Sequence, residues 1–583
     1  MRNVKIIVVD SGVSKNFKGE IQRSYCVRFD KGEYFVEEDC QEDAWGHGTA
    51  VTNIIFSVAP GLEIISFGIC DGLEEVNEEG LVVALEYIFE FLEADIINIS
   101  AGLTYIDDYK RLDDICKRLT KKGCLIFSAF DNDGAVSYPA AFPEVIGIDC
   151  SDHCGKDEII YLKHSCVNCI LPSHYFRTVW KNGERAILKG TSFSCAYMAG
   201  LYGKYLLEEK IENFEQFLAL VVTKTIKCKE SKNLSKPLFN VRKAIIFPIN
   251  KETDVILRNV DKLGFSIVGV YDVRVSGRVG REYLGFAVKA YEEINWNDTF
   301  DTVILSCVQS LQKLTGKNYS EDLLKQSKLA GKNIYSFETA YEENQTVFYP
   351  RLDSTMIPYF KLNKLNKISV PVVGVFGTSS SQGKYSLQNA IVAKLREKEY
   401  EVGFLSTEPS GYLVNADFVF HFGYHSDTGL GLRDIISILN EYIFRMQVEG
   451  KDIVVTGCQS AITHYEATNL FNYCIEQYGF LLGAAPDYSI LCVNPFDDIG
   501  YLERSIQLIN SQGDGKVKAL ALFPRKIEET VTKIKYSARE LSPSEVKHFK
   551  EQIGNRMKLP IYEIGCKNDI NILCNDIEKF FTP

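Results

Sequence analysis

The sequence has no apolar run long enough to cross a lipid bilayer, which excludes a transmembrane helix. The first strand-like run, VKIIVVD, starts almost at residue 1 and leaves no room for a secretory signal. Basic residues are not in excess either, since the net charge is −12 and the pI is near 5.4. This balance argues against a nucleic-acid partner, which favours a basic face. We therefore expect a cytoplasmic protein without a membrane or nucleic-acid partner.

Internal repeats and low-complexity tracts are also missing, so the chain is expected to be globular throughout. Its 17 cysteines are an odd number, scattered through strand-like runs such as FGIC and VILSC. A disulfide framework would place them in pairs in a short, loop-rich chain. The pattern instead favours free thiols in a reducing cytosol.

Three short motifs carry chemistry. They are VVDSGV with Asp10, GHGTAV with His47, and GTSFSCAYMAG with Ser192. A serine hydroxyl is a poor nucleophile at neutral pH, so an imidazole must accept its proton and a carboxylate must hold that imidazole in the right tautomer. The order acid, histidine, serine is that of the subtilisin triad. The N-terminal region therefore resembles the subtilases, the serine proteases of peptidase family S8.

This resemblance implies further site residues. The segment FSAFDNDG matches the strand and loop that carry the oxyanion donor of the family, and it gives that role to Asn132. A turn asparagine is the alternative, because Asn-Asp-Gly is good turn chemistry. Upstream, ADIINISAGL matches the strand that lines the substrate cleft. Ser100, Ala101 and Gly102 are then expected to pair with the substrate backbone as an added strand.

Two positions depart from the family pattern. Ala196 stands where a proline usually follows the nucleophile, and Asp131 stands where a glycine usually precedes the oxyanion asparagine. Neither removes a catalytic atom. A carboxylate beside the oxyanion site would oppose a developing negative charge, so we expect slow or selective hydrolysis. Secreted subtilases also carry an inhibitory propeptide, for which the sequence before Asp10 has no room.

One group of cysteines has a spacing that a structural zinc site could use: Cys150, Cys154, Cys166 and Cys169. In the subtilase comparison they fall on strands between the oxyanion loop and the nucleophile, where small buried cysteines are ordinary core residues. Core packing is the preferred interpretation, and metal binding stays open. Cys195, three residues after Ser192, is expected to pack within a helix.

With 583 residues the chain is too long for one domain. We expect an α/β protein with a subtilisin-like three-layer domain at 1–228, a Rossmann-like domain at 240–345 and a P-loop domain at 366–583. Strand-length apolar runs such as RKAIIFPI and FSIVGVYD alternate with helical segments after residue 240, which predicts a parallel sheet. Gly277 and Gly280 do not fit the dinucleotide fingerprint.

The third region contains a second motif, in which the strand VPVVGVFG runs into TSSSQGKYSLQNAIVAKL. A strand, a glycine loop, a lysine and a helix form the context of a phosphate-binding loop. The candidate nucleotide-binding residues are Gly377, Thr378, Gly383, Lys384, Tyr385 and Ser386. Lys384 would neutralise phosphate charge, and the hydroxyl of Ser386 would bind Mg²⁺.

The loop is one residue longer than the usual P-loop spacing. In this it resembles dethiobiotin synthetase and the DUF1611 family, whose two-domain layout also places a Rossmann-like unit before the P-loop unit. The resemblance implies a pocket lined by Gln459 and Ser460. Thr456 stands where an acidic residue is expected, so metal binding would rest on Ser386 with Glu408 or Asp417. His464 is either catalytic or an ordinary polar residue. ATP with Mg²⁺ and coenzyme A are the candidate ligands, and the sequence does not separate them.

The combination is similar to clostridial peptide maturation proteins. It suggests a cytosolic serine endopeptidase, needing no cofactor for proteolysis, that removes the leader of a ribosomally made precursor peptide. The alternatives are a C-terminal enzyme that modifies a peptide or amino acid with ATP or acyl-CoA before proteolysis, and a P-loop switch that gates proteolysis. A further alternative is a subtilase that has lost activity and serves as a binding module. The intact triad motifs and Asn132 argue against it. The sequence does not indicate an oligomeric state.

Overall fold

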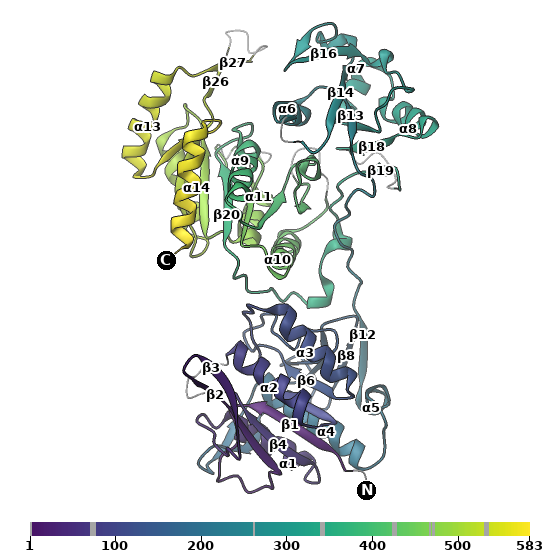
Figure 1. Cartoon of the computed structure of the whole chain (residues 1–583), viewed down its shortest axis with the longest axis vertical. Coiled ribbons are helices and arrows are strands. Elements are labelled where there is room, and N and C mark those ends of the chain that lie inside the picture. Colours follow the sequence, from purple (N-terminus) through teal and green to yellow (C-terminus); the bar gives the residue numbers. More distant parts are fainter. Residues whose placement is uncertain are drawn as a thin grey trace. The chain divides into compact units, whose positions relative to one another are not determined.

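The computed structural model describes residues 3–69, 77–260, 263–338, 344–422, 428–465, 468, 473–529 and 536–582. The chain divides into two compact units, Met1–Ser231 with Pro358–Ser369, and Lys232–Ile357 with Val370–Pro583. The first unit thus differs from the expected 1–228 domain by a short segment that returns to it much later in the sequence. The expected Rossmann-like and P-loop domains share the second unit, in which each keeps its own sheet (Figure 1).

The first unit is built on a ten-stranded sheet with the order β12-β8-β9-β7-β6-β5-β1-β4-β2-β3. Its strands are β1 (Lys5–Asp10), β2 (Arg23–Asp30), β3 (Glu33–Glu38), β4 (Glu63–Gly68), β5 (Ile96–Ile99), β6 (Leu125–Ala129), β7 (Ile146–Ser151), β8 (Ile160–Lys163), β9 (Val167–Pro172) and β12 (Lys224–Lys227). The neighbours pair in parallel except β2 with β3 and β8 with β9. A separate hairpin joins β10 (Phe176–Val179) and β11 (Arg185–Leu188).

Helices cover both faces of this sheet. Its helices are α1 (His47–Val58), α2 (Glu78–Phe91), α3 (Tyr109–Lys121), α4 (Thr191–Leu207) and α5 (Phe214–Val221). Ile6 and Val8 of β1 point to one face and pack in a core cluster with α1 and α4. Ile7 and Val9 point to the other face because strand side chains alternate, and they are buried too. The result is the three-layer arrangement expected from the sequence.

The carboxyl ends of three adjacent parallel strands bring the candidate site together. β1 ends at Asp10, β5 is followed directly by Ser100, and β6 leads through Phe130 to Asn132. Because parallel strands end at the same edge of a sheet, these residues lie on one edge of the first unit.

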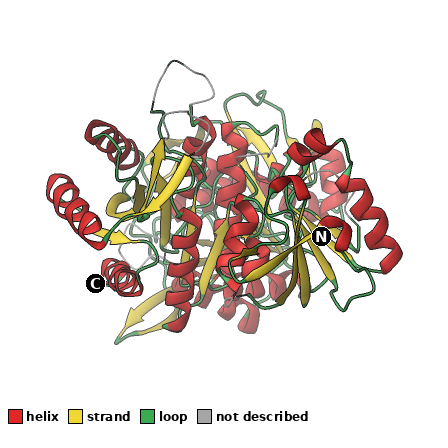
Figure 2. Ribbon diagram, turned by 90° about the horizontal axis from the view of Figure 1, so that it is seen from above, coloured by secondary structure: helices red, strands yellow, loops and turns green. Residues whose placement is uncertain are grey.

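The second unit contains two seven-stranded sheets, with strands yellow and helices red in Figure 2. The first has the order β15-β16-β14-β13-β17-β18-β19. Its elements are β13 (Lys243–Phe247), α6 (Lys251–Arg258), β14 (Ser266–Asp272), β15 (Glu282–Tyr283), β16 (Phe286–Ala290), β17 (Thr302–Leu305), α7 (Gln309–Thr315), α8 (Tyr319–Ala330), β18 (Asn333–Ser336) and β19 (Val347–Phe348). Apart from the short β15–β16 hairpin its strands pair in parallel, as a Rossmann-like domain requires.

The second sheet is all parallel, with the order β22-β21-β23-β20-β24-β25-β28. Its strands are β20 (Val372–Gly377), β21 (Val402–Ser406), β22 (Phe418–Val419), β23 (Ile453–Gly457), β24 (Tyr488–Val493), β25 (Lys516–Leu522) and β28 (Ile561–Glu563), with a β26 (Arg525–Glu529) and β27 (Tyr536–Glu540) hairpin beside them. Its helices are α9 (Lys384–Glu397), α10 (Leu432–Val448), α11 (Ile475–Ala484), α12 (Ile499–Asn510), α13 (Pro543–Met557) and α14 (Lys567–Phe581). The central strand, β20, leads into the phosphate-loop motif. None of the helices in the described residues has the length and apolar character needed to cross a membrane.

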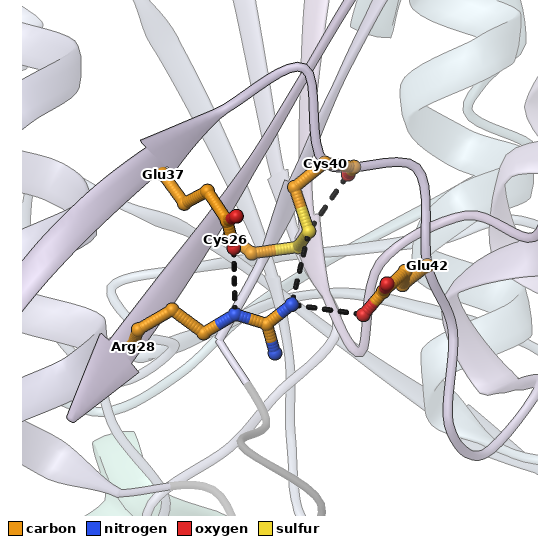
Figure 3. The surroundings of a disulfide bond; sticks show 5 residues. All are labelled: Cys26, Arg28, Glu37, Cys40 and Glu42. Atoms are coloured by element: carbon orange, nitrogen blue, oxygen red, sulfur yellow. Dashed lines mark hydrogen bonds and ion pairs between the residues drawn. A yellow bond between two sulfur atoms is a disulfide. The ribbon is translucent and has the colours of Figure 1, made fainter. Parts of the chain in front are cut away.

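One feature corrects the expectation that the cysteines are all free. Cys26 on β2 and Cys40 just after β3 form a disulfide, and Arg28 donates to Cys40 Sγ at 3.2 Å (Figure 3). The β2–β3 hairpin brings the two Cα atoms to 5.7 Å, a register that sequence spacing does not show. Fourteen other described cysteines are free thiols, and Cys70 lies outside the described residues.

Candidate active site

An acid and an imidazole meet where β1 ends and α1 begins. His47 Nδ1 and Asp10 Oδ1 are 2.7 Å apart, and the same carboxylate oxygen accepts the backbone N–H of Ser11 at 2.7 Å. The Asp10 side chain is 4% exposed and that of His47 is 26% exposed, so the pair is shielded but the imidazole is reachable. This arrangement fixes the ring and places a proton on Nδ1, leaving Nε2 as the acceptor that a general base needs.

A second carboxylate, Asp43, holds the start of α1. Its Oδ1 accepts the N–H of Gly46 at 2.6 Å and the Ser11 hydroxyl at 2.8 Å. Its Oδ2 accepts both the N–H and the hydroxyl of Thr49, at 2.8 and 2.6 Å. Asp43 thus satisfies backbone donors at the helix N-terminus and fixes the backbone on which His47 sits.

The two carboxylates also set the proton affinity of the imidazole. Burial alone would lower the pKa of His47, but the charge of Asp10, its hydrogen bond to the ring and the charge of Asp43 raise it. The net result is a pKa above the ordinary value for histidine. The imidazole therefore becomes a free base only at a higher pH than an unperturbed histidine.

The serine lies in the first turn of α4. Ser192 follows Gly190 and Thr191, and its hydroxyl donates to the carbonyl of Ser100 at 3.1 Å. The ring of Phe193, the next residue, lies 5.3 Å from the ring of His47, which places the imidazole against the same turn. Among the described residues, no hydrogen bond joins His47 to Ser192. Such bonds are often absent without substrate and form in the substrate complex.

Asn132 lies beside this turn. Its side-chain oxygen accepts the N–H of Thr191 at 3.0 Å and the Thr191 hydroxyl at 3.1 Å. The single proton of the Thr191 hydroxyl is shared with the carbonyl of Phe130, which lies closer, at 2.6 Å. Because the backbone N–H can only donate, the amide orientation of Asn132 is fixed, and its NH₂ group remains to donate to another acceptor.

The unusual Asp131 is used inside its own loop. Its Oδ2 accepts the N–H of Asp133 at 3.0 Å and that of Ala135 at 3.4 Å, and its own N–H donates to Ser137 Oγ at 2.9 Å. The carboxylate therefore organises the turn that carries Asn132.

The three residues expected to bind substrate continue from β5. Ser100 and Ala101 are buried, while Gly102 is exposed. Immediately after them, Leu103 exchanges two backbone hydrogen bonds of 2.8 Å with Tyr138. This bridge fixes the end of the segment to which a peptide strand could be added.

The phosphate-loop motif forms a closed loop in the second unit. Gln382 Oε1 accepts the N–H groups of Thr378 and Ser379 at 3.0 and 2.9 Å, and Lys384 Nζ donates to the carbonyl of Ser379 at 2.6 Å. A Cβ at Gly377 would lie 2.5 Å from the Gln382 oxygen and 3.0 Å from Lys384 Nζ, so a larger residue there would displace these two side chains.

Helix α9 begins at Lys384, and Gly383 precedes it with φ 72° and no side-chain cap. Glycine has no side chain that could cap the helix, and a helix N-terminus of this kind suits a bound phosphate. The residue after Lys384, where P-loops usually have a serine or threonine, is Tyr385. It is buried, and its OH accepts the Ser410 hydroxyl at 3.2 Å. Ser386, the expected metal ligand, lies one position further on and is half-buried.

The structure adds polar groups to this loop that the sequence analysis missed. Thr378 donates to Asp497 Oδ2 at 2.5 Å, Asn494 donates to Ser379 Oγ at 2.8 Å, and Tyr501 donates to the carbonyl of Thr378 at 2.6 Å. Burial raises the pKa of Asp497. These residues follow β24, the neighbour of β20, so strand order rather than any motif brings them to the loop.

Comparisons with known proteins match the two parts of the chain that carry these candidate sites. Residues 1–241 match the model of the Subtilase family, and residues 361–568 match that of a domain of unknown function, the DUF1611 P-loop domain. The chain joins a subtilase domain to a DUF1611 P-loop domain. The subtilase match supports a serine protease, and the α/β folds of both parts agree with the sequence analysis.

Among curated proteins, subtilisin-like protease 2 of Plasmodium falciparum is 27% identical over 278 residues, which cover 42% of this chain and 20% of that protein. The chain thus spans about a fifth of the length of this relative. Among solved structures, a cold adapted subtilisin-like serine proteinase is 21% identical with a TM-score of 0.29, covering 35% of this chain and 76% of that one. The epidermin leader peptide processing serine protease of Staphylococcus aureus is 18% identical with a TM-score of 0.29, covering 36% and 66%.

The four cysteines of the subtilase domain with zinc-like spacing have separate surroundings. Cys169 is buried in the main core, and the other three thiols contact different oxygen atoms, namely Cys150 with Ser173, Cys154 with Glu158 and Cys166 with Phe360. No group of three histidine, cysteine, aspartate or glutamate side chains among the described residues could hold a metal ion. Cys195 is fully buried in α4 and contacts Asn98, and burial raises the pKa of its thiol well above the ordinary value.

In the DUF1611 domain, the other expected pocket residues are placed as follows. Gln459 donates to the carbonyl of Thr407 at 2.9 Å, and Ser460 has a left-handed backbone with φ 55°. The ring of His464 stacks on Tyr473. The N–H of Glu408 donates to Ser406, and Asp417 accepts the N–H of Phe404 and forms ion pairs with Arg396 and Lys451. These ion pairs make Asp417 a poor candidate for a metal ligand.

Proposed function

We propose that the subtilase domain hydrolyses peptide bonds with Ser192 as nucleophile, His47 as general base and Asp10 as the group that orients His47. The observation that carries this proposal is the 2.7 Å contact between His47 Nδ1 and Asp10 Oδ1 at the edge where Ser192 also lies. A buried carboxylate on Nδ1 stabilises the imidazolium that forms when Nε2 takes a proton.

In the proposed reaction, Ser192 Oγ forms a bond to the peptide carbonyl carbon and its proton passes to His47 Nε2. The negative charge then rests on the carbonyl oxygen, where the amide NH₂ of Asn132 donates to it. Collapse of this intermediate breaks the C–N bond, and the leaving amine takes the proton from His47. A water molecule then bonds to the acyl carbon and gives a proton to the same imidazole. The bond from that carbon to Ser192 Oγ breaks, and Oγ takes the proton back from His47.

The resting contact between Ser192 and the Ser100 carbonyl fits a substrate-dependent step. In the proposed complex the peptide pairs with Ser100–Gly102, and the serine hydroxyl turns from the Ser100 carbonyl to His47. The enzyme would then be poorly active until a peptide fills the cleft. This supports a selective processing role over general digestion.

The proposed substrate is the leader of a ribosomally made precursor peptide in the cytoplasm. The joining of a subtilase to a DUF1611 domain supports a dedicated peptide substrate. The fourteen free thiols support a reducing compartment, whereas the Cys26–Cys40 disulfide argues against one. The test is to incubate the full chain with candidate precursor peptides and read the products by mass spectrometry. A single cut at the leader boundary, lost in Ser192→Ala, is expected; no cut in any peptide would overturn the proposal.

A second proposed activity is phosphate-ligand binding at the P-loop. It is supported by the start of α9, where Lys384 lies at a helix N-terminus that follows a glycine-containing loop. These residues would hold the phosphates of ATP or coenzyme A, and with ATP a Mg²⁺ ion would offset their charge. The same cleavage assay, run with and without ATP or acetyl-CoA, distinguishes two roles of the P-loop domain. If the domain controls proteolysis, Lys384→Ala abolishes cleavage. If it is a separate modifying enzyme, cleavage continues in Lys384→Ala, and the wild-type chain adds mass to the peptide.

A further inference from the structure

A short segment far along the sequence belongs to the subtilase unit. Residues Pro358–Ser369, here called the strap, come after the Rossmann-like sheet and immediately before β20, yet they group with Met1–Ser231. The strap contains no helix or strand apart from a single 3₁₀ turn at Tyr359–Lys361. Its placement therefore depends on its contacts with the subtilase unit.

The strap bonds to the loop that carries Asn132. The N–H of Val136 donates to the carbonyl of Leu365 at 3.0 Å, and the Tyr138 hydroxyl donates to Asn366 Oδ1 at 3.3 Å. Tyr138 and Asn366 are both buried. The loop from Phe130 to Tyr138 is thus held by the strap after Asn132.

The strap also contacts the part of this loop that precedes Asn132. Lys364 Nζ lies 2.9 Å from Asp149 Oδ2 on β7 and 5.3 Å from the centre of the Phe130 ring. The Lys364 and Asp149 side chains are only 10% and 18% exposed, so this is a largely buried ion pair. Leu362 packs on the small core cluster that contains Phe130. Removing one charge from such a pair leaves the other uncompensated, and the site must rearrange.

A third contact anchors the start of the strap. The carbonyl of Phe360 accepts the N–H of Cys166 at 3.0 Å and the hydroxyl of Ser165 at 2.8 Å. These residues precede β9, the neighbour of β7. The strap therefore spans from the β7–β9 side of the sheet to the far end of the Asn132 loop.

We infer that the strap is a positioning element of the oxyanion site: Lys364, Leu365 and Asn366 hold the Phe130–Tyr138 loop so that the Asn132 amide faces the reacting carbonyl. The inference rests on the proposed peptidase activity. The Asn132 side chain bonds to Thr191. The loop around it has bonds of its own, such as that from the Asp131 N–H to Ser137, and the strap adds contacts on both sides of Asn132. Displacements of about 1 Å at such a donor can cost a large part of the rate.

The test measures kcat and KM for the best-cleaved peptide, and the rate of labelling by a fluorophosphonate, in the full chain. Lys364→Met and Asp149→Asn each remove one charge of the buried pair; the amide of the Asp149→Asn variant would keep an oxygen for the Cys150 N–H, which Asp149 Oδ1 accepts at 2.8 Å. Each variant is made alone and together with Asn132→Ala. Two variants serve as controls. Lys364→Arg keeps a positive charge at position 364, and Lys367→Met removes the ammonium group of another strap lysine, which lies over the Tyr105 ring.

If the strap acts through Asn132, Lys364→Met and Asp149→Asn lower kcat and labelling by about tenfold with KM within about twofold, and either change has almost no further effect when Asn132 is already alanine. Lys364→Arg restores the rate, and Lys367→Met leaves it unchanged. Equal effects with and without Asn132 would overturn the inference, as would a Lys364→Met enzyme as fast as the wild type. A wild-type chain that neither cleaves nor reacts would instead refute the proposed function.

Discussion

The side-chain oxygen of Asn132 accepts both the backbone N–H and the hydroxyl of Thr191, the residue before Ser192. The two sites of a proposed acyl-transfer reaction, nucleophile and oxyanion donor, are therefore tied together by one residue. A shift of α4 would move both at once, and this keeps their separation constant.

Loss of the donor should act on the chemical step. Asn132→Ala is expected to lower kcat by about 10²–10³-fold with little change in KM, because its amide is proposed to bond only to the developing oxyanion. Asp133→Ala, in the same turn, is the control. A KM effect larger than the kcat effect would mean that Asn132 binds the ground state.

Ser192 should be the only serine that reacts with a fluorophosphonate. Wild type is expected to be labelled and Ser192→Ala not, because the probe needs an activated hydroxyl. Ser194→Ala is the matched control, two residues further along α4 and almost fully buried. Equal labelling of wild type and Ser192→Ala would contradict the assignment.

The pH dependence should report the pKa of His47. Only the neutral imidazole accepts a proton, so kcat/KM is expected to rise with pH through a pKa above that of an ordinary histidine. Asp43→Asn removes a charge that raises this pKa, and the acidic limb should move to lower pH. Glu42→Gln is the control, because Glu42 pairs with Arg28. A limb that stays in place in Asp43→Asn would argue that Asp43 acts only as a helix cap.

The P-loop should stabilise the chain when its ligand is present. ATP with Mg²⁺, or coenzyme A, is expected to raise the melting temperature of wild type, since a ligand that binds only the folded state stabilises it by mass action. Lys384→Ala should abolish the shift. Lys394 lies on the same helix and pairs with Glu397, so Lys394→Ala is the control and should preserve the shift in melting temperature. A flat wild-type response to both ligands at saturation would count against phosphate binding.

The disulfide should stabilise the subtilase unit. Cys26→Ser is expected to lower its free energy of unfolding by about 3 kcal/mol, the chain-entropy estimate for a loop of this length. Urea unfolding measures the difference, and thiol counting by mass spectrometry shows the bond. Cys154→Ser, a free half-buried cysteine, is the control. If wild type and Cys26→Ser unfold at the same urea concentration, the bond is not formed in the native protein.

The fold class and the motifs of the first candidate site could be predicted from the sequence because their signals are local. Asp10, His47 and Ser192 each sit in a short motif at the end of a strand or start of a helix, and the α/β alternation is visible in apolar runs. The catalytic and phosphate-binding roles stay predictions. The Cys26–Cys40 bond was wrongly excluded, because its formation depends on the register of β2 and β3.

Other features depend on contacts between residues far apart in sequence. Asp497 reaches the P-loop only because β24 lies next to β20. Lys364 meets Asp149 across more than two hundred residues, and the segment around it has no motif. Side-chain periodicity carries no information on such pairings, since each is fixed by the packing of whole elements.

The strap also fixes the order in which the protein can mature during synthesis. At about 5–20 residues per second, the ribosome needs on the order of 10 s to pass from Ser231 to Ser369. During that interval the subtilase sheet can form, but the loop that carries Asn132 lacks Lys364 and Leu365. The Rossmann-like strands are therefore made before the strap, and a chain broken off within them would carry Ser192 without the contacts that Lys364 and Leu365 make beside the Asn132 loop.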